Sequence, residues 1–167
     1  RLTLRIAELG TLERENETLR LLAHVAESMP GVTAPIVSSI QSSPYGTFMV
    51  GAGSEEGVGK GDLVLASASG DKGFVIGRVS EVSAHTSLIT QVFAPDASTE
   101  AMAGKVPLVV EGQGGGNARA QVSREIEIGV GETVVSSRFH GLPIGVVGSV
   151  AADSASAYQT LYIGLPL

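Results

Sequence analysis

The 167-residue sequence contains neither cysteine nor tryptophan, and aromatic residues make up only 4% of it. The absence of cysteine excludes disulfide bonds and metal sites built from thiolates, and it leaves the redox compartment open. The scarcity of aromatic side chains means that any core is built from smaller ones. With 22 glycines and many valines and serines, the composition is typical of a tightly turning β protein.

Basic residues and long apolar runs are also scarce. The 11 Lys and Arg residues stand against 17 Asp and Glu, which gives a formal net charge of −6. Proteins that bind nucleic acid concentrate Lys and Arg, so nucleic acid is not an expected partner. No apolar run approaches the roughly 20 residues that cross a bilayer as a helix, and no signal-peptide pattern is present. Because the sequence begins inside a helical pattern without Met, we expect a fragment, and the lack of an apolar span within it is no evidence of a soluble parent protein.

A motif that occurs twice organises the rest of the sequence. The first copy reads Gly-Lys-Gly-Asp-Leu-Val over residues 59–64 and is followed by Ile-Gly-Arg-Val-Ser-Glu-Val at 76–82. The second copy reads Gly-Val-Gly-Glu-Thr-Val over 129–134 and is followed by Ile-Gly-Val-Val-Gly-Ser-Val at 144–150. The repetition predicts two similar β modules built on one supersecondary plan.

The glycines of these motifs predict tight turns. In each turn we expect the acidic side chain to accept hydrogen bonds from backbone amides rather than to handle protons. A further glycine-rich turn is predicted at 112–116, because this segment lacks the Lys-Ser/Thr pair and the helix of a phosphate-binding loop. The residues assigned to structural turns are Gly59, Gly61, Asp62, Gly114, Gly115, Gly129, Gly131 and Glu132.

Residues 1–29 predict a helix, because they carry no proline and are rich in Leu, Glu and Arg. Their heptad spacing is coiled-coil-like, and the polar Asn16 in the seam is of the kind that fixes register and strand number. A single amphipathic helix lying on its own globular domain is the alternative. The residues expected to mediate self-association are Leu2, Leu9, Leu12, Asn16 and Leu19.

The predicted fold is mainly β: an N-terminal, coiled-coil-type α-helix followed by two small β-barrel domains of similar plan. The close spacing of short strands favours small barrels over a sandwich of long strands. The first strand, at 32–40, has no obvious partner in the first barrel, and its pairing with the second barrel is an open alternative. The expected divisions are the helix at 1–29, a linker and first strand at 30–43, one barrel at 44–99 and the other at 100–167.

We find no catalytic or metal-binding constellation in the sequence. The three histidines are too far apart to suggest a zinc site. The order His85, Asp96 and then Ser136 or Ser137 imitates that of a serine protease, and such proteases use paired small barrels. Neither serine lies in a glycine-flanked loop that would form an oxyanion hole. We therefore expect no enzyme activity, no cofactor and no metal, with a protease-like enzyme as an alternative.

Several segments, taken in order, carry a resemblance to a known family. They are the Leu/Glu/Arg helix ended by Pro30, Tyr-Gly-Thr-Phe at 45–48, Gly-Ser-Glu-Glu-Gly-Val-Gly-Lys-Gly-Asp-Leu-Val at 53–64, Ile-Gly-Arg-Val-Ser-Glu-Val at 76–82, Glu-Gly-Gln-Gly-Gly-Gly-Asn at 111–117 and Pro-Ile-Gly-Val-Val at 143–147. Together they resemble MreC, the bacterial rod shape-determining family, over essentially the whole chain. One departure is the short segment at 137–143, where the family usually has a longer apolar loop that carries proline.

The resemblance implies a protein anchored in the cytoplasmic membrane by a helix upstream of Arg1, with a coiled coil and two β-barrels on the periplasmic or extracytoplasmic side. It also implies a non-enzymatic scaffold of the peptidoglycan-synthesising elongation machinery, which maintains rod shape. The implied partners are further copies of the chain, in dimers or larger assemblies, and MreD, MreB, RodA and the elongation-specific penicillin-binding protein. A periplasmic adaptor of a transport system is another alternative, although such adaptors usually carry a long helical hairpin within a lipoyl-like module.

Overall fold

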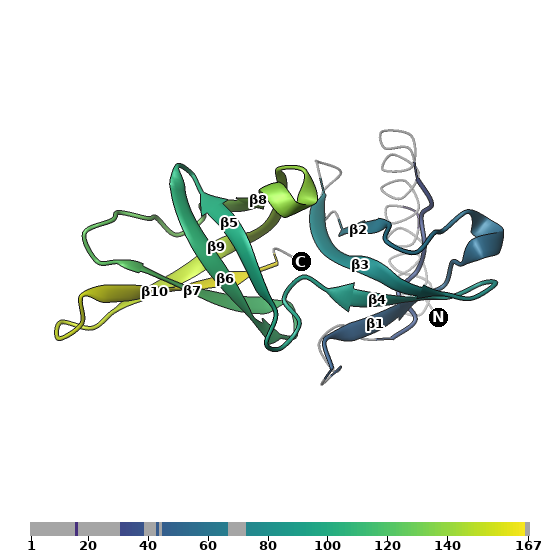
Figure 1. The fold of residues 1–167 in the computed structure, drawn as a ribbon, viewed down its shortest axis with the longest axis horizontal. Helices are drawn as coiled ribbons and strands as arrows, with labels where there is room; N and C mark the ends of the chain where they lie inside the picture. The colour runs from purple at the N-terminus through teal and green to yellow at the C-terminus, as the bar shows by residue number, and fades with distance from the viewer. Residues whose placement is uncertain (1–15, 17–30, 39–42, 44, 67–72, 166–167) are drawn as a thin grey trace, which may run out of the picture.

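The computed structural model describes residues 16, 31–38, 43, 45–66 and 73–165. Among these residues the chain is mainly β, as predicted, and its strands form two separate sheets. One sheet is open and four-stranded, and the other closes into a barrel (Figure 1). No helix of the described part is long and apolar enough to span a membrane.

The first sheet has the strand order β1-β4-β3-β2, and every neighbouring pair is antiparallel. Its strands are β1 (Thr47–Val50), β2 (Leu63–Ala66), β3 (Phe74–Val82) and β4 (Ser87–Gln91). A 3-10 turn, η1 (Ser54–Glu56), lies between β1 and β2. Alternate residues of β1 point into a small core, because successive side chains of a strand face opposite sides of the sheet. The buried members of that core are Phe48, Val50, Ile76, Val79 and Ile89.

The described part of the segment at 32–40 pairs with the first sheet. Ile36 forms an isolated antiparallel bridge with Val50 of β1. The Val37 amide donates to the Met49 carbonyl at 2.8 Å, and the Gly51 amide donates to the Pro35 carbonyl at the same distance. The described residues of this segment therefore pair with β1 and the glycine that follows it. For these residues the alternative in which the segment pairs with the second barrel is wrong.

The second sheet is a closed six-stranded barrel with the order β10-β7-β6-β5-β8-β9. Its strands are β5 (Ser98–Ala103), β6 (Val106–Gly114), β7 (Asn117–Ser123), β8 (Thr133–Ser136), β9 (Leu142–Ala152) and β10 (Tyr158–Gly164), with a 3-10 turn, η2 (Ser137–Phe139), between β8 and β9. Strand β7 shows why the sequence folds this way. It alternates exposed and buried residues along most of its length, and its inward positions carry Ala118, Ala120 and Val122. Small inward side chains fit a barrel of this size, whose interior is filled by side chains.

The second module forms a barrel as predicted, but the described residues of the first module form an open sheet, so the plan of two barrels is not confirmed. In the barrel, the hairpin of β5 and β6 bridges β7 and β8 and closes the ring. In the first module no described strand lies between β1 and β2 except the short stretch around Ile36, so the sheet stays open. The predicted N-terminal helix lies outside the described residues, apart from the helical, exposed Asn16.

The two copies of the repeated motif occupy equivalent strands. The order β1-β4-β3-β2 corresponds to β7-β10-β9-β8, and both β2–β3 and β8–β9 shift register after their second residue, at Val64 and Val134. Ile89 pairs with Val79 as Ile163 pairs with Val147, and each pair lies beside a second register shift. On the same alignment the Ile36 bridge takes the place of β6, so only β5 lacks a counterpart among the described residues.

Strand β5 was not predicted; it begins at Ser98 and so crosses the predicted boundary between residues 99 and 100. The strand lacks the β-branched run that marks its neighbours. It nevertheless alternates strictly, with Thr99, Ala101 and Ala103 buried and the residues between them exposed. Small alanines at the inward positions hid a period-two pattern that polar and charged outward residues still display.

Candidate functional site

The two modules meet at a short buried linker that follows β4. Val92 and Phe93 belong to the core cluster of the barrel. The Gly114 amide donates to the Phe93 carbonyl at 2.8 Å, and the Gly112 amide donates to the Ala97 carbonyl at the same distance. A side chain at Gly112 would collide with the Ala94 carbonyl oxygen. The junction is therefore closely packed, with strand β3 of the open sheet lying against β9 of the barrel.

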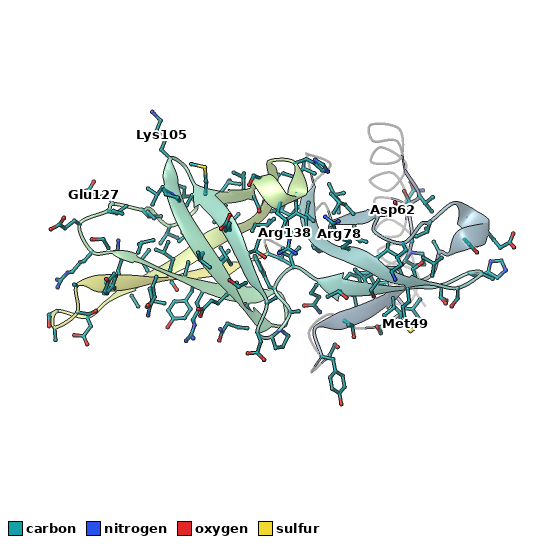
Figure 2. All side chains as sticks on the ribbon, viewed as in Figure 1. Met49, Asp62, Arg78, Lys105, Glu127 and Arg138 are labelled. Carbon is teal, nitrogen blue, oxygen red and sulfur yellow. The ribbon has the colours of Figure 1, made fainter. Side chains whose placement is uncertain are left out.

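A pocket of about 360 Å³ opens beside this junction. Residues from both modules line it: Arg78 of β3 and Thr90 of β4 come from the open sheet, and Ser98 of β5 and Arg138 of η2 come from the barrel. The ring of Phe139 forms another part of the wall. Figure 2 shows both arginines at the boundary between the two modules. The pocket exists only because the linker holds the modules together.

The two arginines give this pocket a positive charge. The Arg78 guanidinium lies 5.6 Å from the centroid of the Phe139 ring, a cation–π arrangement that orients it. Within the described residues neither Arg78 nor Arg138 forms an ion pair, whereas Arg119 pairs with Glu111 at 3.2 Å. None of the described residues that line the pocket is Asp or Glu. Sequence reasoning missed both arginines, because nothing in the sequence brings residues from two modules together. The one signal is that Arg78 stands where the second copy of the repeat has Val146.

The first predicted turn carries a carboxylate that bonds to the backbone. Asp62 Oδ2 accepts a hydrogen bond from the Gly59 amide at 2.8 Å, while Gly61 adopts a φ of 91°. The Gly61 amide donates to the Val79 carbonyl and the Val79 amide donates to the Asp62 carbonyl, each at 2.9 Å. The turn thus joins the start of β2 to the middle of β3.

The second predicted turn repeats this backbone geometry with a different use of its carboxylate. Gly131 adopts a φ of 92°, and its amide donates to the Val147 carbonyl at 2.8 Å. The Val147 amide donates to the Glu132 carbonyl at 2.9 Å. The longer Glu132 side chain lies against Gly104 instead of bonding to Gly129, whose counterpart Gly59 is held by Asp62. The predicted hydrogen bond from a backbone amide to the acidic side chain is therefore present at Asp62, and the described residues show none for the side chain of Glu132.

The glycine-rich segment forms the hairpin between β6 and β7. Gly114 pairs with Asn117, and Gly115 and Gly116 form the two-residue turn with φ values of 63° and 80°. Positive φ at both central residues matches the twist of the flanking strands, and glycine adopts it without steric cost. The segment is a structural turn and has no phosphate-loop geometry.

Two of the residues that imitate a protease, His85 and Ser136, are bound to other partners. His85 lies in the β3–β4 turn, and its Nδ1 is 2.8 Å from Glu56 Oε1, so Nδ1 carries the proton that the carboxylate accepts. This hydrogen bond and another from the Gly53 amide lower the pKa of the Glu56 carboxyl. The Ser136 hydroxyl is buried and donates to the Glu100 carbonyl at 2.6 Å. No triad is assembled from these residues, and the protease-like alternative is not favoured.

Two further predictions, that the chain binds no metal and that its N-terminal helix self-associates, stay predictions. Among the described residues, no three His, Cys, Asp or Glu side chains lie close enough to hold a metal ion. Of the residues expected to mediate self-association, four lie outside the described part of the chain, and Asn16 is described as helical and exposed.

The chain is similar to known proteins in both its sequence and its fold. The family model of the rod shape-determining protein MreC, barrel core, matches residues 36–166. The structure is similar to the crystal structure of MreC from Pseudomonas aeruginosa, with a TM-score of 0.63 and 20% identity over 80% of this chain and 89% of that one. It is also similar to a solved structure named MreC, with a TM-score of 0.68 and 21% identity over 92% of this chain and 91% of the other. A search of curated protein sequences finds no match.

The family match spans both sheets, from the bridge at Ile36 to beyond the end of β10. The solved structures share the fold at low identity, and the family model supplies the evidence from sequence. The resemblance found in the ordered motifs is therefore confirmed. This chain belongs to the family of rod shape-determining proteins MreC.

Proposed function

We propose that the chain acts as a non-enzymatic scaffold of the machinery that elongates the cell wall of rod-shaped bacteria. The observation that carries this proposal is the match of the family's barrel core to residues 36–166. The described surface supports it, because the one pocket described above is lined by arginines, hydroxyls and an aromatic ring rather than by a nucleophile with its base. Such a scaffold works by holding other proteins in place.

The scaffold would use two kinds of surface. The helix at 1–29 would bring copies of the chain together through Leu2, Leu9, Leu12, Asn16 and Leu19. The β modules would bind partners through barrel faces and exposed strand edges, which are ready templates for pairing with another chain. The outer edge of β2 is one such edge, since among the described residues it pairs only with β3.

The partners and location of this scaffold follow from the family resemblance. We propose that it lies on the periplasmic or extracytoplasmic side, anchored to the cytoplasmic membrane by a helix upstream of Arg1. There it would contact MreD, RodA and the elongation-specific penicillin-binding protein, and it would reach MreB through its cytoplasmic end. No nucleic acid is proposed as a partner, in keeping with the net charge of −6.

Analytical ultracentrifugation tests the self-association. The wild-type chain is expected to dimerise or form larger assemblies in a concentration-dependent way. The double substitution Leu12→Asp with Leu19→Asp is expected to abolish this, because two carboxylates in an apolar seam would have to be desolvated. A matched double substitution of exposed barrel residues, Met102→Asp with Val109→Asp, is expected to leave association intact. A wild-type chain that stays monomeric at high micromolar concentration would contradict the proposal.

A further inference from the structure

The junction pocket combines a positive charge with an absence of internal carboxylates. The guanidinium groups of Arg78 and Arg138 line one cavity without an ion-pair partner in the described part of the chain. Both arginines are exposed and line the same cavity, so their combined positive potential favours an anion there. The chain as a whole carries a net charge of −6, which makes a local pair of unpaired arginines stand out. The cavity is therefore suited to bind an anion.

The shape and lining of the pocket narrow the choice of anion. Arginine binds planar carboxylates through two parallel hydrogen bonds. Thr90, Ser98 and Thr99 bring hydroxyl-bearing side chains to the same cavity, and hydroxyls donate to oxyanions as well. The volume of about 360 Å³ is at the small end for a ligand site, and it suits one acidic side chain with its adjoining backbone better than a large cofactor.

We propose that this pocket binds the carboxylate of an Asp or Glu side chain presented by a partner protein. The choice of a protein as the source of the carboxylate rests on the proposed scaffold function. Arg138 would form the two-point contact, and Arg78, held over the Phe139 ring, would supply the second charge. Because the site is shared between the sheet and the barrel, binding would also join the two modules more firmly.

A titration with short peptides, followed by two-dimensional NMR of the whole chain, tests the proposal. The probes are acetyl-Ala-Glu-Ala-amide, the same peptide with Gln in place of Glu, and inorganic phosphate. The Glu peptide is expected to shift the amide signals of Thr90, Ser98 and Phe139 in a saturable way. Arg138→Gln is expected to raise its dissociation constant by about ten-fold or more, since a charge-assisted pair is lost. Arg78→Lys keeps the charge but loses the planar fork, so it is expected to weaken binding less.

Lys105→Gln is the matched control, because it removes one positive charge from the far end of the barrel, away from the pocket (Figure 2). It is expected to leave the dissociation constant unchanged. The proposal is overturned if the Gln peptide binds as tightly as the Glu peptide, or if Lys105→Gln weakens binding as much as Arg138→Gln does. Phosphate that binds as tightly, with the same dependence on both arginines, would also overturn it in favour of a simple anion site. Analytical ultracentrifugation of the same variants measures self-association independently. A failure of peptide binding is thereby told apart from a failure of self-association.

Discussion

The open sheet and the closed barrel are built on the same four-stranded plan, and they differ in what lies between the first and last strands of that plan. In the barrel, β5 and β6 fill the space between β7 and β8. In the open sheet, the stretch around Ile36 takes the place of β6, and no described strand takes the place of β5. One plan thus yields a closed unit without edges and, among the described residues, an open unit whose strand β2 has an unpaired outer edge.

The difference has consequences for the two cores. The core cluster of the barrel includes linker residues and Val75 of the neighbouring sheet, whereas the separate hydrophobic cluster of the open sheet has only five buried members among the described residues. When a buried side chain is truncated, an open sheet collapses into the resulting cavity more readily than a closed barrel does. Closure gives rigidity, and openness gives an edge that a partner is able to use. A scaffold benefits from both.

The largest expected effect comes from truncating the matched isoleucines. Ile163 of β10 and Ile89 of β4 hold equivalent positions and are both buried. Ile163→Ala is expected to lower the free energy of unfolding by about 2–5 kcal/mol, and Ile89→Ala is expected to fall at the lower end of that range, because the open sheet collapses more readily. Urea denaturation measures both. A larger loss at Ile89 would contradict the contrast between the modules.

A second matched pair adds a methyl group instead of removing a side chain. A Cβ at Gly77 would lie 2.5 Å from Ile89 Cγ2 and 2.6 Å from the Thr90 carbonyl oxygen, and a Cβ at Gly145 would lie 2.8 Å from Ile163 Cγ2. Both substitutions to Ala are expected to cost about 1–3 kcal/mol, with Gly77→Ala the worse because its nearest backbone oxygen is closer, at 2.6 Å, than the Gly164 oxygen at 3.1 Å from a Cβ on Gly145. Gly129→Ala, which meets nothing within 4 Å, is the control for the same thermal melts. Equal stability of all three variants would argue against this close strand packing.

A smaller loss of stability is expected from substitutions in the two turns of the repeated motif. Because the turns are equivalent, the two losses are expected to be equal. Gly61 and Gly131 have φ values of 91° and 92°, and neither position crowds a new Cβ. Alanine at either position is therefore expected to cost about 1–2 kcal/mol through backbone strain alone. The two losses, measured by chemical denaturation, should agree within experimental error. Clearly unequal losses would show that the turns are not equivalent.

The smallest effect concerns the hydrogen bond between His85 and Glu56 at the tip of the open sheet. Hydrogen bonds from His85 and from the Gly53 amide lower the pKa of Glu56 in the folded state below its ordinary value near 4.5. A lowered pKa stabilises the folded protein above the ordinary value, and this contribution is lost as the pH falls through the folded pKa. Glu56→Gln is expected to lower the melting temperature slightly at neutral pH and to make no difference in acid. A difference that grows in acid would reverse the sign and contradict the assignment.

How far the sequence predicted this structure depends on where the information lay. Strand β3 (Phe74–Val82) contains the repeated segment at 76–82, whose β-branched residues were predicted to belong to the first β module. The doubled turn motif was predicted from its glycines, whose positive φ values leave little choice of residue. Local patterns carried these predictions.

The failures were nonlocal. Whether a sheet closes depends on whether its edge strands find a bridging hairpin, and β5 was missed because alanines fill its inward positions. The arginine pocket was missed because Arg78 and Arg138 come together only after the linker has docked the two modules. Closure and docking are properties of the packed molecule, and no window of sequence displays them.

Native-state amide hydrogen exchange at β2 and β8 tests the contrast between the modules most directly. Val64 and Leu65 of β2 hold the positions that Val134 and Val135 hold in β8, where β5 pairs with them. The amides of β2 that face away from β3 are expected to exchange through local openings, much faster than the β8 amides that face β5. Equal protection of the two strands would mean that the edge of β2 is covered, and it would contradict the account of an open module beside a closed one.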